Sequence, residues 1–396
     1  DLASSFTAGA NAITLTNAGN DFTGAVSLSN SGTNDVSLTD VNALDLGTVG
    51  VGQNLTVTTG GVLTDSGAVT VAGLGTIVST GFDVTLGDST TANFGSLDFS
   101  GAAVSITEAS AMEVAASEAT GALTLVASGA VTQSGAIDAD STASVTAGAN
   151  AITLTNAGND FTGAVSLSNS GSNDVALTDA NALDLGTVGV GQNLTVTTGG
   201  ALTDSGAITV GSLATLVSTG QSVTLGDSTT ANFGSLDFAG AAVSIKEGSS
   251  MEIAASEATG ILTLEASGAI TQTGAVDADL ASSFTAGANA ITLSDASNDF
   301  TGAVSLSNSG TNDVALRDAN ALDLGTVGVG QSLSVVAAGA ISDTGVVTVA
   351  GTTTLDNSAG GSAAILLDSA STYTGNVTFI TGTGSDVTIT DNSDFA

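Results

Sequence analysis

Internal repetition limits the fold of this chain more than any other feature of its sequence. The stretch NDFTGAVSLSNSG occurs three times, with its aromatic residue at Phe22, Phe161 and Phe300, a period of 139 residues. A weaker similarity inside each copy divides it into two half-units of about 70 residues. Fixed periods of this kind are typical of proteins that stack one structural unit on the next.

The repeat boundaries follow from this period. We predict three consecutive repeats in one continuous rod, over residues 1–139, 140–278 and 279–396. The third copy follows the pattern to about Gln331 and then diverges. In its last half-unit, Tyr373 stands where Phe22 stands in the first.

Short apolar–hydroxyl–apolar triplets recur within each half-unit and predict its secondary structure. Examples are Ile13–Leu15, Val36–Leu38 and Leu55–Val57. Such alternation is the pattern of a half-buried strand, and the Gly, Asn, Asp and Ser residues between triplets supply turns. The triplets lack Asn-Gly hairpin signals, which favours a coil that climbs one strand spacing per turn over a meander or sandwich. The sequence therefore predicts an all-β, parallel β-helix (β-solenoid) of roughly 19 coils of about 20 residues.

Charge and composition exclude many function classes. The chain has 38 acidic and 2 basic residues, Lys246 and Arg317, and a formal charge of −36, which argues against nucleic-acid and anionic-membrane binding. It has no His and no Cys, which removes zinc sites and Cys or Ser/His catalysis. Both basic residues replace a Thr of the sister copies, so we expect them to be exposed.

No apolar run exceeds about five residues, far short of the ~18 that a membrane span requires. The chain begins at Asp1 without a signal-like segment. We expect a soluble excerpt of a longer secreted protein, with no membrane insertion in this segment.

One aromatic residue recurs in each half-unit. These residues are Phe22, Phe94, Phe161, Phe233, Phe300 and Tyr373. Because they recur with the repeat, we predict a shared structural stacking role at a corner of the coil rather than ligand binding.

Carboxylates are the one plentiful reactive group. Asp35, Asp40 and Asp45 recur in every copy. A pair of carboxylates can hydrolyse a glycosidic bond, but identical acids in each repeat argue against a single catalytic cleft, so we predict no catalytic residues and no enzyme. We also predict that no cofactor is required.

Calcium binding is a better explanation of the acidic residues than catalysis. The candidate ligands lie next to oxygen-rich turns and are Asp138, Asp140, Asp277 and Asp279. The competing interpretation of the same residues is a solvated acidic face.

Regular threonine arrays suggest another kind of surface. Thr56 and Thr58, with Thr195 and Thr197, are candidate rungs of an ice-binding plane. Such a plane needs the motif on successive coils, whereas the motif is visible once per repeat. We therefore interpret these threonines as ordinary strand residues.

Three segments carry a resemblance to a known family: NDFTGAVSLSNSG, GGVLTDSGAVTVAG at Gly60–Gly73 and GGALTDSGAITVGS at Gly199–Ser212. In these repeats the chain resembles the β-helical regions of filamentous-haemagglutinin-like exoproteins, the giant secreted adhesins and matrix proteins of Gram-negative bacteria. The resemblance implies a right-handed β-helix, an extracellular or cell-surface location, and a role in adhesion, aggregation or biofilm structure.

Charge and resemblance together give the functional expectation. We expect a non-enzymatic extracellular structural protein, the rigid acidic shaft of a surface adhesin or matrix filament. The alternative is a glycan- or Ca²⁺-binding β-solenoid module. The expected partners are other copies, in fibres or bundles, and divalent cations; the high negative charge predicts that bundling requires such cations or a low pH.

Overall fold

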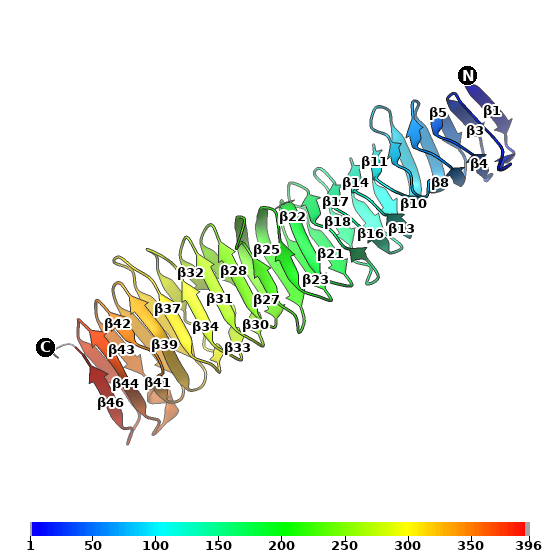
Figure 1. The fold of residues 1–396 in the computed structure, drawn as a ribbon. Coiled ribbons are helices and arrows are strands. Elements are labelled where there is room, and N and C mark those ends of the chain that lie inside the picture. Colours follow the sequence, from blue (N-terminus) through cyan, green and yellow to red (C-terminus); the bar gives the residue numbers. More distant parts are fainter. Residues whose placement is uncertain (1, 393–396) are drawn as a thin grey trace. The chain divides into compact units, whose positions relative to one another are not determined.

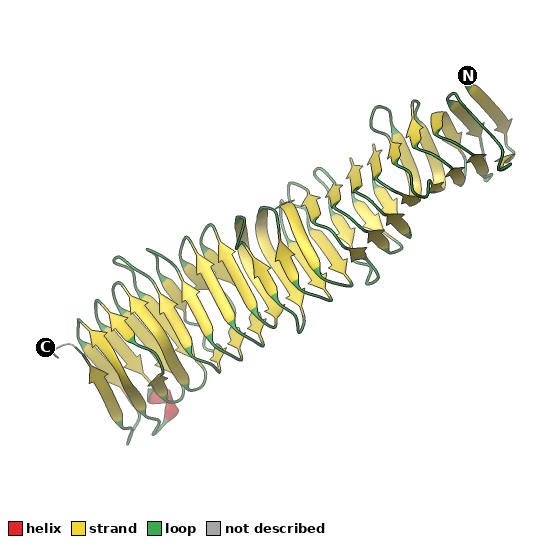
Figure 2. Ribbon diagram, in the orientation of Figure 1, coloured by secondary structure: helices red, strands yellow, loops and turns green. Residues whose placement is uncertain are grey.

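The computed structural model describes residues 2–392 and divides into two compact units, residues 1–199 and 200–396. Within each unit, parallel strands are stacked coil upon coil (Figure 1). The chain is an all-β parallel β-solenoid of about 19 turns of roughly 20 residues, so the predicted fold class is confirmed. The one helix in the described part is the short η1 (Ser358–Gly360), drawn red in Figure 2.

Three faces make up each coil, and we call them face 1, face 2 and face 3. Face 1 is continuous in both units. In unit 1 it consists of β2 (Ile13–Leu15), β4 (Val36–Asp40), β6 (Leu55–Thr59), the second halves of β8 (Val69–Val78) and β10 (Ala92–Gly101), β12 (Met112–Val114), β15 (Val131–Gln133), β18 (Ile152–Leu154), β21 (Val175–Asp179) and β23 (Leu194–Thr198). In unit 2 it consists of the second halves of β25 (Ile208–Ser218) and β27 (Ala231–Gly240), β29 (Met251–Ile253), β32 (Ile270–Gln272), β35 (Ile291–Leu293), β38 (Val314–Asp318), β40 (Leu333–Ala337), β43 (Thr353–Asp356) and β45 (Val377–Ile380).

Face 2 is the second continuous ladder. In unit 1 it consists of β1 (Ser4–Gly9), β3 (Val26–Asn30), β5 (Leu44–Val51), β7 (Leu63–Asp65), β9 (Val84–Leu86), β11 (Val104–Glu108), β14 (Leu123–Ala127), β17 (Ala143–Thr146), β20 (Val165–Ser168) and β22 (Leu183–Val190). In unit 2 it consists of β24 (Leu202–Asp204), β26 (Val223–Leu225), β28 (Val243–Glu247), β31 (Leu262–Ala266), β34 (Ser282–Thr285), β37 (Val304–Ser307), β39 (Leu322–Val329), β41 (Ile341–Asp343), β44 (Ile365–Tyr373) and β46 (Val387–Asp391).

Face 3 is built from shorter strands and from the ends of long strands that bend around a corner. In unit 1 it consists of the end of β5 and the first halves of β8 and β10. It continues in β13 (Ser117–Ala119), which pairs with Ser100 and Gly101 at the end of β10, and in β16 (Ile137–Ala139) and β19 (Asp160–Phe161). In unit 2 it consists of the first halves of β25 and β27, and it continues in β30 (Ser256–Ala258), which pairs with Ala239 and Gly240 at the end of β27. The remaining strands of this face are β33 (Val276–Ala278), β36 (Asp299–Phe300), the end of β39, β42 (Val347–Val349) and the end of β44.

Alternate residues of each strand point inward and form the core. In face 1, Leu38 pairs with Val57, and Val57 pairs with Ile77 on the next coil. None of these three side chains is more than 1% exposed. Burying a large apolar side chain contributes roughly 1.5–3 kcal/mol, so the interior of each unit is a set of stabilising apolar columns.

One recurrent corner shows why the turns need glycine and asparagine. Gly32 has a φ of 71°, and an added Cβ at Gly52 on the next coil would lie 2.3 Å from the carbonyl oxygen of Gly32. Asn30 fills the corner, donating to the carbonyl oxygen of Asn34 at 2.9 Å and accepting from the Gly52 amide at 3.0 Å. Any side chain at Gly52 would separate these two coils.

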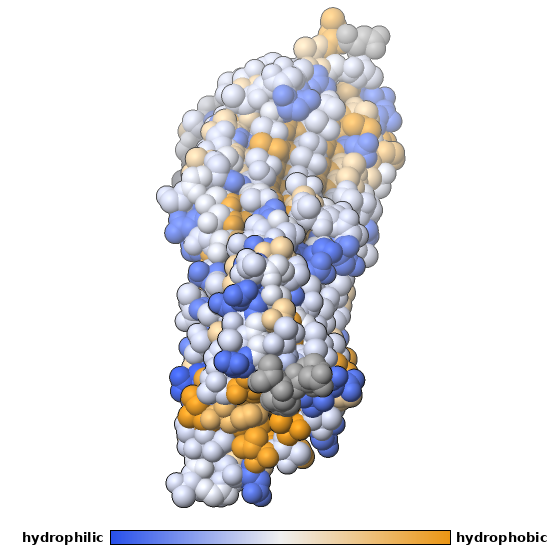
Figure 3. All heavy atoms as spheres, turned by 90° about the vertical axis from the view of Figure 1, so that its left-hand side faces the viewer, coloured by the Kyte–Doolittle hydropathy of each residue, from blue (hydrophilic) through white to orange (hydrophobic). Residues whose placement is uncertain are grey.

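The last two coils of unit 2 carry exposed apolar side chains. Leu366, Ile380 and Val387 are each more than 40% exposed. Figure 3 looks at this end of unit 2 and shows hydrophobic atoms gathered on it.

Candidate functional site

The most regular polar feature of the fold is a carboxylate beside the backbone N–H of each recurrent aromatic residue. We call each such pair an aromatic–carboxylate rung. The rungs are Phe22 with Asp40, Phe94 with Glu108, Phe161 with Asp179, Phe233 with Glu247, Phe300 with Asp318, and Tyr373 with Asp391. The Phe22 amide donates to Asp40 Oδ1 at 2.9 Å, and the Phe233 amide donates to Glu247 Oε1 at 3.0 Å. The aromatic residues named from the sequence therefore occupy one equivalent place in every half-unit.

Five of the six rung carboxylates lie in the core. Asp40, Glu108, Asp179, Glu247 and Asp318 are no more than 2% exposed. In each, at least one carboxylate oxygen lacks a hydrogen bond of ordinary geometry among the described residues, and in Glu108 both oxygens do, although the Phe94 N–H lies close enough to lower its pKa. A buried, incompletely paired carboxylate favours its neutral, protonated form.

Burial shifts the proton affinity of four of the rung carboxylates, Glu108, Asp179, Glu247 and Asp318. It raises the pKa of Glu108 to about 8 and the pKa of Asp318 to about 6, and it also raises the pKa values of Asp179 and Glu247. Hydrogen bonds from the aromatic amides oppose the shift, and in Glu247 so does the Ser249 hydroxyl, which donates at 2.9 Å. Glu108 consequently keeps its proton at pH 7.

The aromatic rings pack against one another or against apolar neighbours. Phe22 meets Phe6 edge-on, with ring centroids 5.9 Å apart and an interplanar angle of 81°. Phe300 meets Phe284 in the same way, at 5.9 Å and 83°. In the second repeat the position of Phe6 is taken by Val145, and the ring of Phe161 is 1% exposed.

A second set of buried acids was missed by the sequence analysis. These acids are Asp65, Asp204 and Asp343. Asp65 accepts hydrogen bonds from the Gly87 amide at 2.9 Å and from Thr90 Oγ1, which ties two coils together. The signal that could have found these acids is strand parity: in LTD the Asp follows an inward Leu by two residues, and in VSITE the Glu is inward for the same reason.

The calcium candidates of unit 1 lie on the outer side of face 3. Asp138 pairs with Glu118 on one neighbouring coil and with Asp160 on the other, so three outward acids form a ladder. Burial, and then the charges of Asp140 and Asp160, raise the pKa of Asp138.

Unit 2 repeats this arrangement. Asp277 pairs with Glu257 and Asp299, and burial, followed by the charges of Asp299, Asp279 and Glu257, raises the pKa of Asp277. Within residues 2–392, no group of three or more acidic residues is arranged to hold a metal ion. Both ladders place like charges in register on neighbouring coils.

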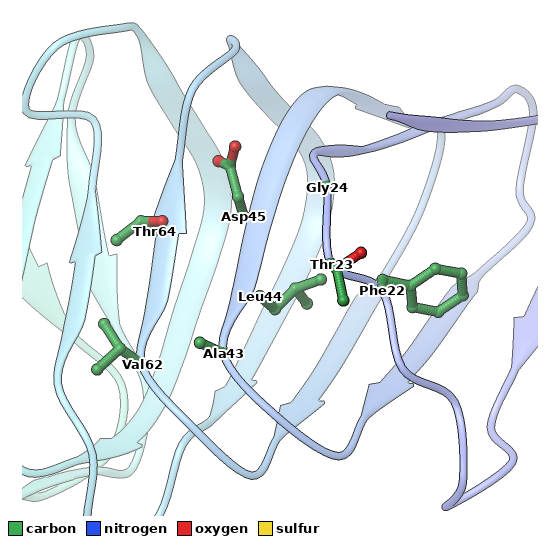
Figure 4. A pocket seen from close by; sticks show the side chains of 8 residues that line it. All are labelled: Phe22, Thr23, Gly24, Ala43, Leu44, Asp45, Val62 and Thr64. Carbon is green, nitrogen blue, oxygen red and sulfur yellow. The ribbon is translucent and has the colours of Figure 1, made fainter. Parts of the chain in front are cut away.

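The pockets are small surface hollows. The first has a volume of about 150 Å³ and is lined by Phe22, Thr23, Gly24, Ala43, Leu44, Asp45, Val62 and Thr64 (Figure 4). Its one carboxylate, Asp45, accepts a hydrogen bond from the Ser66 hydroxyl at 2.7 Å. The second, of about 340 Å³, is lined by Asp237, Phe238, Ala239, Ala255, Ser256, Glu257, Ala275 and Asp277. The first pocket is lined by one carboxylate, whereas the second is lined by three, Asp237, Glu257 and Asp277.

Hydroxyl side chains line the outer side of face 1 on three successive coils, although the Thr-x-Thr motif itself lies on only one of them. Ser37 pairs with Thr56, and Thr56 pairs with Thr76. The row was missed because neighbouring coils carry different hydroxyl triplets, and it ends where Asp98 pairs with Thr76.

Face 2 carries longer rows of outward hydroxyls, one per coil. In unit 1 the row is Thr85, Ser105, Thr124, Ser144 and Ser166. In unit 2 it is Thr203, Thr224, Ser244, Thr263, Ser283 and Ser305. Lys246 lies beside the second row, exposed as predicted, and its Nζ atom is 2.8 Å from Glu265 Oε1 on the next coil.

A comparison with known protein families shows to which family the chain belongs. The model of the family described as "Repeats of unknown function (DUF5649)" matches six segments, residues 3–29, 33–97, 101–168, 172–237, 240–307 and 311–380. The chain belongs to this family. Searches of curated proteins and of solved structures gave no match. In the DUF5649 repeats described by the structure, no helix is long and apolar enough to cross a membrane.

Proposed function

We propose that this chain is a non-enzymatic extracellular structural protein, the rigid acidic shaft of a bacterial surface adhesin or of a matrix or biofilm filament. The observation that carries the proposal is the repetition of the aromatic–carboxylate rungs. The same aromatic–carboxylate pair recurs in all three copies of the repeat, so this chemistry serves the fold of every copy rather than one cleft. The resemblance to filamentous-haemagglutinin-like exoproteins supports the extracellular location.

Parallel pairing supports a mechanical role. Strands pair with neighbouring coils on both sides within each unit, and their backbone groups are used in the ladder. A chain that uses its length and stiffness needs this continuous pairing, whereas an enzyme needs one differentiated site.

Self-association is part of the proposal. The formal charge of −36 makes separate copies repel one another, and either divalent cations or a pH low enough to protonate the Asp side chains would allow bundles to form. Calcium acts here as a bridge or screen between copies, and the in-register acids Glu118, Asp138 and Asp160 are its contact points.

The test is electron microscopy and fibre diffraction of the purified chain with and without Ca²⁺. We expect filaments or bundles with a ~4.8 Å repeat along the axis. Calcium should promote bundling and leave the melting temperature within a few degrees of that in EDTA. Strong calcium-dependent folding would instead favour a Ca²⁺-binding module. Polysaccharide hydrolysis that is abolished by Asp277→Asn, in the pocket lined by three carboxylates, would contradict the non-enzymatic role.

A further inference from the structure

Charge is distributed unequally over the three faces. Face 3 carries the acidic ladders described above, and the outward positions of face 1 include Asp98 and Glu113 in unit 1 and Asp237 and Glu252 in unit 2. The outward positions of β9, β11, β14, β17 and β20 on face 2 carry only Ser, Thr and Val. We call the outer side of these strands the neutral face of unit 1, and the outer side of β24, β26, β28, β31, β34 and β37 the neutral face of unit 2.

The neutral face of unit 2 keeps its net charge at zero by an ion pair. Glu265 stands where unit 1 has Val126, and Lys246 stands where unit 1 has Thr107. Thr107 and Val126 are register partners in unit 1, just as Lys246 and Glu265 are in unit 2. One of only two basic residues in the chain therefore cancels the one outward acid on this face.

We propose that the neutral face is the surface through which one copy of this chain docks laterally on the neutral face of a second copy. This inference rests on the proposed self-association and names the surface that performs it. Two strongly acidic molecules approach most closely where neither presents a charge, because like charges repel within a Debye length of about 10 Å. A second copy also has the same axial repeat, so hydroxyl rows on both partners stay in step over many coils.

The size of the face predicts a weak contact that gains strength by repetition. In unit 2, six strands at ~4.8 Å spacing, with three to five residues each at ~3.3 Å, give a patch of about 29 by 13 Å, or roughly 380 Å² per partner. About 760 Å² in total is less than a stable specific interface buries. Association therefore depends on several such patches acting together, as in multivalent binding.

Disulfide trapping tests the docking surface. Because the chain has no cysteine, the introduced thiol is the only one that can form a disulfide. Ser144→Cys places a thiol on the neutral face, while Thr132→Cys on face 1 and Glu118→Cys on face 3 are matched controls, all at outward positions. Under mild oxidation in screening salt, we expect the Ser144 variant to form covalent dimers at least tenfold faster than either control. Equal or faster dimer formation by a control would overturn the proposed face and leave self-association intact.

Removal of the ion pair's charges gives a second, independent test, in which sedimentation measures dimerisation. Lys246→Thr leaves Glu265 unpaired and should weaken dimerisation, whereas the double variant Lys246→Thr/Glu265→Val reproduces the unit 1 face and should restore it. The matched control Glu252→Gln changes an outward charge on face 1 and should not weaken dimerisation. An unchanged dimerisation constant in Lys246→Thr would refute the face.

A different partner would also be visible in these experiments. If all variants stay monomeric at every salt concentration, self-association itself fails. If the neutral face instead retards the chain in gels containing a neutral polysaccharide, and Thr124→Asp abolishes that retardation, the partner is a glycan and the proposal of a second copy is wrong.

Discussion

The Glu rungs and the Asp rungs hold the same aromatic amide but satisfy their carboxylates differently. Asp318 receives backbone hydrogen bonds from Ala319, Asn320 and Phe300, whereas neither oxygen of Glu108 has a partner of ordinary hydrogen-bond geometry among the described residues. Both side chains are 1% exposed. The pKa is nevertheless about 6 for Asp318 and about 8 for Glu108. The short side chain at the strand end reaches the amides of the following turn, and the longer one does not.

The largest expected effect tests what the two kinds of rung share. Phe94 and Phe161 are 5% and 1% exposed, so we expect Phe94→Ala and Phe161→Ala each to destabilise their coils by about 3–5 kcal/mol. Site-resolved hydrogen exchange of the flanking strands measures this loss, because a repeat protein need not unfold in one step. The half-buried Phe22 is the control, and Phe22→Ala should cost less. A cost below 1 kcal/mol at Phe94 alone would show that the rungs are not packed alike.

The second prediction concerns the Glu rung and its pH dependence. The pKa of Glu108 rises from its ordinary 4.5 to about 8 on folding, so its stabilising contribution is complete below pH 4.5 and is lost as the pH rises towards 8. The slope is up to ~1.4 kcal/mol per pH unit for one group. Glu108→Gln should remove this slope around β11 and raise local stability at pH 8.5.

Hydrogen exchange between pH 5 and 9, corrected for intrinsic rates, measures this slope. The outward Glu113→Gln is the matched control and should keep the wild-type pH profile. A Glu108→Gln variant that loses stability with rising pH as steeply as the wild type would disprove the assignment.

The alternation of inward and outward residues along each strand predicts much of the fold and the inward position of the rung carboxylates. The alternation in VSITE is enough to place Glu108 inward, and the triplet spacing predicted the parallel coil. The acidic ladder through Asp138 could not be predicted in the same way, because register between coils depends on the length of each turn. The pairing of Thr76 with Thr56 could not be predicted either, because their triplets differ in sequence and only the turn length brings the two residues into register.

The third prediction addresses the Asp rung. The pKa of Asp318 rises from 3.8 to about 6, so its contribution is complete below pH 3.8 and disappears by about pH 6. Asp318→Asn should flatten the profile in that window and leave the slope between pH 6 and 8 unchanged. The comparison between the rungs fails if one variant flattens both windows.

The smallest effect separates stability from docking on the neutral face. Lys246 and Glu265 are about half exposed, with side-chain exposures of 52% and 46%, so their ion pair should contribute only about 0–1 kcal/mol to folding. Thermal melts of Lys246→Thr and of Lys246→Thr/Glu265→Val should lie within a few degrees of the wild type. Raising the salt concentration should reduce even that difference, because screening weakens an exposed pair. If Lys246→Thr lowers the free energy of unfolding by several kcal/mol, the ion pair holds neighbouring coils together. Its presence on the neutral face would then be explained by stability rather than by docking.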